Sequence, residues 1–261
     1  MSRRVQCARR AREVLVGAAA MTVAMMVLLS AQIPASADTP DLTGKVIVLD
    51  PGHQLGNTNP AFAKQMSATK FNGDIVKGCN TSGTATNAGL PEATFTWKVA
   101  NDLADALRAQ GARVILTRPG NSYHLWGPCV WNRAEVANQA KADAFVSIHA
   151  DGAAAGGRGF HVITAAAIPG WTHDRPSADA KLATAMVAGM TAAGATPTTY
   201  LSAPLVRRKD ETTLNFNSRP AVMVEVGNMR NPRDAALMSS AAGQHQYASW
   251  LLAGLNRYFA G

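Results

Sequence analysis

Three short apolar runs, rich in branched side chains, each lead to a histidine or a glutamate. They read KVIVLDPGH at 45–53, FVSIHAD at 145–151 and AVMVEVGN at 221–228. Runs of this length and composition predict strands that are covered on both faces. Open α/β sheets place their chemistry just beyond strand ends, so we expect His53, His149 and Glu225 to converge in one cleft.

Helical periodicity alternates with these strands. From Glu92 to Leu107, apolar residues recur at three- and four-residue spacing; Pro91 suits the first turn and Gly111 ends the helix. The pattern also predicts helices near 130–141, 177–190 and 233–258, and strands at 112–117, 159–165 and near 199–206. The fold class that follows is α/β, a single domain whose mixed, mainly parallel sheet has helices on both faces.

Residues 54–90 form a long segment dense in Gly, Asn, Thr and Ser that contains Cys79. A segment of this length inside a compact domain is usually functional or partly ordered by a hairpin of its own. We expect a disulfide to hold it in place.

The N-terminus has the pattern of a secretory signal peptide. Five arginines precede an apolar run at 14–31, and Ala35-Ser36-Ala37 provides a small-residue cleavage site, so residues 1–37 are expected to be removed. An uncleaved anchor helix is the alternative, and Arg3-Arg4 also permits twin-arginine export. We therefore expect an exported protein of the periplasm or cell wall, with no stable membrane span after cleavage and a catalytic domain at 38–261.

Cleavage would change both the charge and the cysteine count. The formal net charge falls from +8 to +4, because the leader holds five basic residues and one acidic residue. No aromatic ladder accompanies the basic stretch at 207–209, which argues against nucleic-acid binding. Cys79 and Cys129 remain once Cys7 is lost, and two cysteines in an exported chain favour a disulfide over free thiols or a redox pair.

The predicted cleft contains the donors of a catalytic zinc. Imidazole nitrogens and a carboxylate oxygen hold such an ion while a fourth position takes water, and His53, Glu92 and His149 are the candidates. A second carboxylate must then move the proton of the water, and Glu225 is the candidate for that acid/base role. The histidines at 124, 161, 173 and 245 receive no role.

These segments together resemble a known family. IVLDPGH at 47–53, the acidic Glu92 at a helix start, the stretch from Arg133 to Asp151 and VEVGN at 224–228 are similar to the zinc-dependent N-acetylmuramoyl-L-alanine amidases, specifically the amidase-3 family. The resemblance implies a six-stranded sheet and one zinc per chain on His53, Glu92 and His149, with Glu225 as acid/base. It also implies hydrolysis of the amide between the lactyl group of muramic acid and L-alanine, in peptidoglycan or muropeptide fragments.

The chain also departs from that family. Gln54-Leu55-Gly56 replaces the glycines usual after the first histidine, and Val226-Gly227-Asn228 replaces the usual sequence after the catalytic glutamate. Neither a helical insertion that could plug the cleft nor a wall-binding module is evident. The expectation is therefore a monomer that is active without an activator.

Two supporting residues and two rival functions complete the expectations. Arg133 could bind a substrate carboxylate or, as we favour, an internal acid such as Glu135 or Asp143. Asp50 is expected to cap the turn or to hold a ligand histidine. The rival functions are another zinc peptidase acting on stem peptides and a non-catalytic peptidoglycan-binding module.

Overall fold

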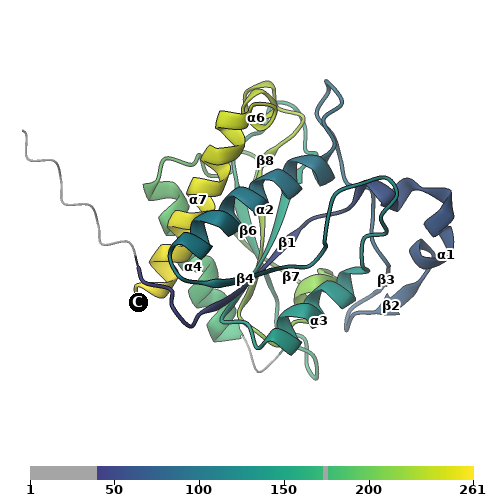
Figure 1. Cartoon of the computed structure of the whole chain (residues 1–261), viewed down its shortest axis with the longest axis horizontal. Coiled ribbons are helices and arrows are strands. Elements are labelled where there is room, and N and C mark those ends of the chain that lie inside the picture. The colour runs from purple at the N-terminus through teal and green to yellow at the C-terminus, as the bar shows by residue number, and fades with distance from the viewer. Residues whose placement is uncertain (1–39, 173–175) are drawn as a thin grey trace, which may run out of the picture. The chain divides into compact units, whose positions relative to one another are not determined.

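Six strands form one sheet in the order β4-β1-β5-β8-β6-β7 (Figure 1). The structure, a computed structural model, describes residues 40–172 and 176–261, so the predicted leader, Cys7 and His173 lie outside the described residues. The strands are β1 (Val46–Pro51), β4 (Arg113–Leu116), β5 (Ala144–Asp151), β6 (His161–Ala165), β7 (Leu205–Arg208) and β8 (Ala221–Asn228). Neighbouring strands pair in parallel except β6 and β8, which are antiparallel. The predicted mixed, mainly parallel sheet of about six strands is confirmed.

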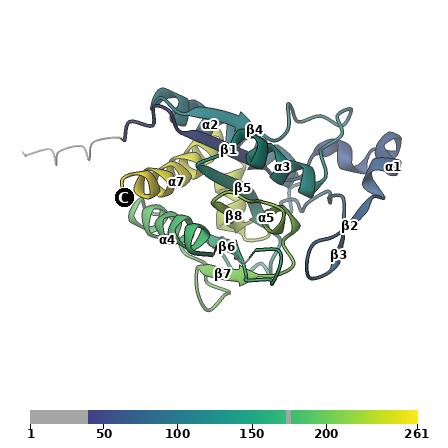
Figure 2. The same ribbon diagram turned by 90° about the horizontal axis from the view of Figure 1, so that it is seen from below.

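Helices cover both faces of the sheet (Figure 2). On one face lie α2 (Glu92–Ala109), α4 (Pro176–Ala192) and α7 (Ala241–Phe259), and on the other lie α3 (Val130–Ala140) and the short α5 (Thr212–Asn215). The apolar runs supply both cores, because alternate residues of one strand face opposite sides: Ile47 and Leu49 face the first core, and Val48 faces the second. This double covering explains why the central strands β1, β5 and β8 are mostly apolar.

Helix α7 packs closely against both of its neighbours. The rings of Phe95 in α2 and Tyr247 in α7 meet edge to face with centroids 5.3 Å apart. On the side of α4, a Cβ on Gly189 would lie 2.5 Å from the carbonyl oxygen of Ala253, so the absence of a side chain lets the two helices approach. The helix layer holds α2 firmly, and α2 carries Glu92 at its first position.

Two of the predicted elements were wrong in extent. The expected single helix over 233–258 is two helices, α6 (Pro232–Met238) and α7, because the side chain of Ser240 accepts a hydrogen bond from the backbone N–H of Gly243 and caps a new helix. The expected strand near 199–206 begins only at Leu205. Pro204, which lacks an N–H donor, precedes it, and its carbonyl oxygen accepts from Val162.

The long segment at 54–90 has structure of its own. It contains two 3₁₀ turns, at Leu55–Thr58 and Pro60–Phe62, the single-turn α1 (Ala63–Met66), and a hairpin of β2 (Thr69–Phe71) and β3 (Val76–Gly78). The expected hairpin is therefore present. Among the described residues, no helix is both long and apolar enough to cross a membrane.

Candidate active site

His53, Glu92 and His149 meet at one edge of the sheet. His53 Nε2 lies 3.1 Å from Glu92 Oε1, His149 Nδ1 lies 3.0 Å from the same oxygen, and the two imidazole nitrogens are 3.1 Å apart. The three side chains come from the end of β1, the start of α2 and the body of β5. The expected convergence of these residues is what the structure contains, although no local motif links them.

The spacing of the three donor atoms suits a small tetrahedral ion. Four ligands at about 2.0–2.1 Å from zinc lie roughly 3.3 Å from one another, close to the observed separations. Two imidazole nitrogens and one carboxylate oxygen are also the donor types of catalytic zinc sites, which keep one position open. The residues therefore fit a zinc ion, and they fit it without rearrangement of the backbone.

The carboxylate of Glu92 is fixed through both of its oxygens. Oε1 accepts from the backbone N–H of Ala150 at 3.1 Å, and Oε2 accepts from that of Thr84 at 2.9 Å. Burial alone would raise the pKa of Glu92, but the charge of His53 and hydrogen bonds from both imidazoles outweigh it and lower that pKa. In turn, although burial opposes it, the hydrogen bond and charge of Glu92 raise the pKa of His149 to about 9.

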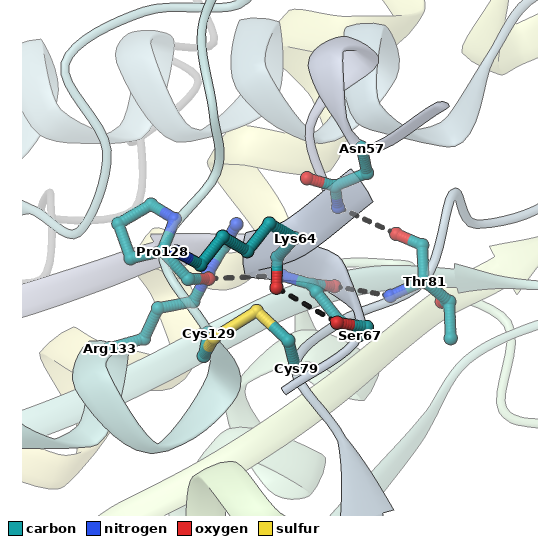
Figure 3. Close-up of a disulfide and its surroundings, with 9 residues drawn as sticks. Asn57, Lys64, Ser67, Cys79, Thr81, Pro128, Cys129 and Arg133 are labelled. Atoms are coloured by element: carbon teal, nitrogen blue, oxygen red, sulfur yellow. Dashed lines mark hydrogen bonds between the residues drawn. A yellow bond between two sulfur atoms is a disulfide. The ribbon is translucent and has the colours of Figure 1, made fainter. Parts of the chain in front are cut away.

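His53 is held from behind by the disulfide-bonded segment. Its Nδ1 lies 3.0 Å from the carbonyl oxygen of Thr81, which also accepts from the side chain of Asn57 at 2.7 Å. With Nδ1 donating to Thr81, Nε2 is the nitrogen left for a metal. Two residues before Thr81, Cys79 forms the expected disulfide with Cys129, and Figure 3 shows this bond with Asn57 and Thr81 nearby.

Arg133 and Asp50 form a buried ion pair beneath the site. Arg133 Nη1 donates to Asp50 Oδ1 at 2.9 Å, and the same guanidinium donates to the carbonyl oxygens of Pro51 and His53 at 2.8 Å. The expected internal role of Arg133 holds, but the partners named for it, Glu135 and Asp143, were wrong. Those partners were chosen for nearness in sequence, whereas the sheet brings β1 beside α3.

Asp50 also differs from its expected role. Its carboxylate accepts from Thr117 at 2.5 Å, from Ser147 at 2.6 Å and from Arg133, and none of these partners within residues 40–172 and 176–261 is a histidine. Asp50 thus acts on His53 through Arg133, which binds the carbonyl group of that residue. The backbone there needs this support, because His53 has a φ of 59°, a left-handed conformation that costs free energy for a residue other than glycine.

Glu225 lies between two histidines in the sheet. It is the register partner of His149 in β5 on one side and of His161 in β6 on the other. The register of β5 and β8 shifts just beyond this point, between His149 and Asp151, as at a β-bulge. Bulges of this kind redirect side chains and recur beside active sites.

The carboxylate of Glu225 is prepared for proton transfer. Burial raises its pKa to about 8, against the opposing effect of His149. Among the described residues, its Oε2 is buried without a hydrogen-bond partner. A carboxylate with a pKa near neutrality and one free oxygen can both accept and return a proton at physiological pH.

A cavity of about 340 Å³ opens over these groups. The residues identified from the sequence that line it are His53, Glu92, His149, Glu225, Asp50 and Arg133. Further lining residues come from β3 and α5, including Lys77 and Thr212. The candidate metal ligands and the candidate acid/base therefore share one cavity.

Several residues of the site received no role in the site from the sequence. Gly52 and Gly83 are needed for space: a Cβ on Gly52 would lie 2.4 Å from His149, and one on Gly83 would lie 2.7 Å from Glu92. Tyr200 donates to Asp151 at 3.0 Å, and its ring lies edge to face against His161. The sequence placed His161 within a predicted strand. It did not predict that this strand pairs with β8, and so it did not place His161 beside Glu225.

The comparisons with known proteins agree with this geometry. Residues 47–257 match the family model Amidase_3, described as N-acetylmuramoyl-L-alanine amidase. N-acetylmuramoyl-L-alanine amidase Rv3717 of Mycobacterium tuberculosis is 39% identical over 239 residues, which cover 90% of this chain and 96% of that protein.

Solved structures give the same result. The N-acetylmuramyl-L-alanine amidase Ami1 of Mycobacterium smegmatis superposes with a TM-score of 0.77 at 36% identity, over 84% of this chain and 99% of that one. The apo form of Ami1 from Mycobacterium abscessus superposes with a TM-score of 0.75 at 38% sequence identity, over 83% of this chain and 99% of that one. The chain therefore belongs to the amidase-3 family of N-acetylmuramoyl-L-alanine amidases, enzymes that hydrolyse the bond between N-acetylmuramic acid and L-alanine in peptidoglycan.

Proposed function

We propose that this amidase is a zinc enzyme, with one ion held by His53, Glu92 and His149 and with Glu225 as the catalytic acid/base. The observation that carries the proposal is the mutual separation of 3.0–3.1 Å between the three donor atoms. We infer zinc, rather than another divalent ion, from the ligand types together with the family, because the affinity order of the divalent metals would not select it.

The side chains divide the reaction among them. When bound, zinc supplies a Lewis acid that polarises the scissile carbonyl and acidifies water. Glu225, in its ionised form, takes a proton from the attacking water through its free Oε2. The same carboxyl group then gives that proton to the leaving nitrogen of L-alanine as the C–N bond breaks. His53 is held on the side away from the metal position by the contact of its Nδ1 with the carbonyl oxygen of Thr81.

The proposal includes where the enzyme acts. We infer that residues 1–37 are a cleaved signal peptide and that residues 38–261 act as a monomer on peptidoglycan or its muropeptide fragments, in the periplasm or cell wall. The cell-wall substrate and the Cys79–Cys129 disulfide both support an oxidising, extracytoplasmic location.

Metal analysis and product identification test the proposal. Residues 38–261 should contain one zinc per chain and release free L-alanyl peptide with intact muramic acid. The variant His149→Ala should lose both zinc and activity, whereas Glu225→Gln should keep zinc and lose turnover. Zinc-free protein with full activity would contradict the metal assignment, and cleavage at another bond of the stem would indicate a peptidase.

A further inference from the structure

A second cavity adjoins the catalytic one. Its volume is about 500 Å³, and it shares Gly83 and Thr84 with the cavity over the metal ligands. The backbone at Gly83 and Thr84 thus separates the two cavities, and it contacts the candidate metal ligands. The N–H of Thr84 donates to Glu92, and a Cβ on Gly83 would lie 2.7 Å from the ring of His53. A substrate with its scissile amide at the site can extend from there into this second cavity.

The two cavities differ in charge. Arg230, at the end of β8, lines the second cavity, and no carboxylate side chain is among its lining residues. Within the described residues, no acid lies within salt-bridge distance of Arg230; its Nη1 donates to the neutral side chain of Asn87 at 3.0 Å. The guanidinium is half-buried and therefore has donors available for an anion.

The cations that line the catalytic cavity, by contrast, already have acidic partners. Lys77 pairs with Asp210 at 3.5 Å, and Arg133 pairs with Asp50 at 2.9 Å. Arg230 differs from both, since its side chain donates to a neutral amide, and it can therefore pair with an anionic part of the substrate.

We propose that the second cavity binds the stem peptide and that Arg230 pairs with the first free carboxylate beyond the scissile bond, the one on the second stem residue. The inference rests on the proposed catalytic site and names the direction in which substrate lies across it. Leu55, Ala85 and Pro91 give the cavity apolar contacts for the peptide. The planar guanidinium gives it a bidentate donor that matches a carboxylate. The saccharide, which has no charge near the lactyl group, then lies on the other side of the catalytic site.

Paired substrates test the role of this charge. Two N-acetylmuramyl tripeptides are compared, one with a free carboxylate on its second stem residue and one with that group converted to a carboxamide. The wild type should cleave the carboxylate form with a kcat/KM about tenfold higher. In Arg230→Met this preference should disappear through loss on the carboxylate substrate alone, and Arg230→Lys should restore part of it.

The matched control is Arg233→Met. Arg233 is exposed, lies three residues further along the chain and does not line the cavity, so its loss should leave the substrate preference unchanged. Equal losses on both substrates in Arg230→Met, or the same change in the Arg233 variant, would overturn the inference.

A binding measurement separates this inference from the catalytic proposal. Calorimetric titration of both tripeptide substrates into Glu225→Gln and into Glu225→Gln/Arg230→Met needs no turnover. Tighter binding of the carboxylate form that is lost with Arg230 supports the inference even if zinc proves absent. Equal affinities for the two forms overturn it even if zinc-dependent cleavage is established.

Discussion

Arg133 and Asp50 pair at 2.9 Å with side chains that are only 1% and 2% exposed. Removal of the cation alone would leave a buried carboxylate without its charge partner. Arg133→Met should therefore lower the free energy of unfolding by about 3–5 kcal/mol. Denaturant titration followed by circular dichroism measures this loss. The exposed pair of Arg108 and Asp105, at 3.2 Å, provides the control: Arg108→Met should change stability by less than about 0.5 kcal/mol.

The same ion pair should make the free energy of unfolding depend on pH. Although burial would raise the pKa of Asp50, the charge of Arg133 and hydrogen bonds from Ser147 and Thr117 lower it. The ionised carboxylate thus stabilises the fold above the unfolded pKa of about 4, and this contribution is lost as pH falls through the lower folded pKa. The stability gap between wild type and Asp50→Asn should narrow in denaturant titrations below pH 4. A gap of constant size from pH 7 to pH 3 would contradict the assignment.

Gly52 is required because His149 occupies the space where its side chain would be. A Cβ at this position would lie 2.4 Å from His149 Cε1, so Gly52→Ala should displace that imidazole and lower zinc affinity by at least tenfold. Competition with a chromogenic chelator measures the affinity. Gly156→Ala is the matched control, since a Cβ there meets nothing within 4 Å. Equal zinc affinities in the two variants would show that the site can adjust.

The buried carboxyl group of Glu225 should lower the free energy of unfolding of the metal-free protein. Burial raises its pKa to about 8, so the folded state keeps a proton that the unfolded chain releases near pH 4. The cost grows as pH rises from about 4 to about 8. Glu225→Gln should thus be more stable than wild type at pH 8, by roughly 1–4 kcal/mol, and nearly equal to it at pH 4. Thermal melts of the metal-free proteins at pH 4 and pH 8 measure this difference in stability. A Glu225→Gln variant less stable than wild type at pH 8 would contradict the prediction.

The disulfide should stabilise both the fold and the metal site. Its loop spans 50 residues, so Cys79→Ala/Cys129→Ala should lower the free energy of unfolding by about 4 kcal/mol. Because Thr81 follows Cys79 closely and holds His53, zinc should also dissociate faster from this variant. Stopped-flow chelation measures the rate. Reductant should reproduce both effects in wild type and change nothing in the double variant; an unchanged melting temperature in reduced wild type would count against a structural bond.

The sequence predicted the sheet and the convergence of the site because both depend on short-range pattern. Apolar runs covered on two faces define strands, and parallel strands bring their carboxyl ends to one edge. The convergence of His53, His149 and Glu225 was expected from that rule, whereas Glu92 was added as the acidic residue that begins the following helix. The split of the last helix at Ser239–Ser240 did not, because one side-chain hydrogen bond decides it and the apolar stripe continues on both sides.

Contacts between distant segments were beyond such reasoning. Pro51-Gly52 reads as a turn, yet the structural demand on Gly52 comes from His149, almost a hundred residues away. The partner of Arg133 was wrong for the same reason, since Asp50 comes beside it only through the pairing of strands. The register that places Glu225 opposite His161 depends on an antiparallel strand, which no periodicity distinguishes from a parallel one.

The Cys79–Cys129 bond has a consequence for local fluctuations. Cys79 belongs to the segment that holds His53, and Cys129 precedes α3, which carries Arg133. Loop segments often open independently of the core at low free-energy cost, and these amides then exchange with solvent rapidly. The disulfide joins this segment to the residue that precedes α3, so an opening of the segment pulls on the start of the helix that carries Arg133. In the oxidised chain, we therefore expect the loop behind His53 and the first turn of α3 to exchange their amide hydrogens together, and more slowly than after reduction.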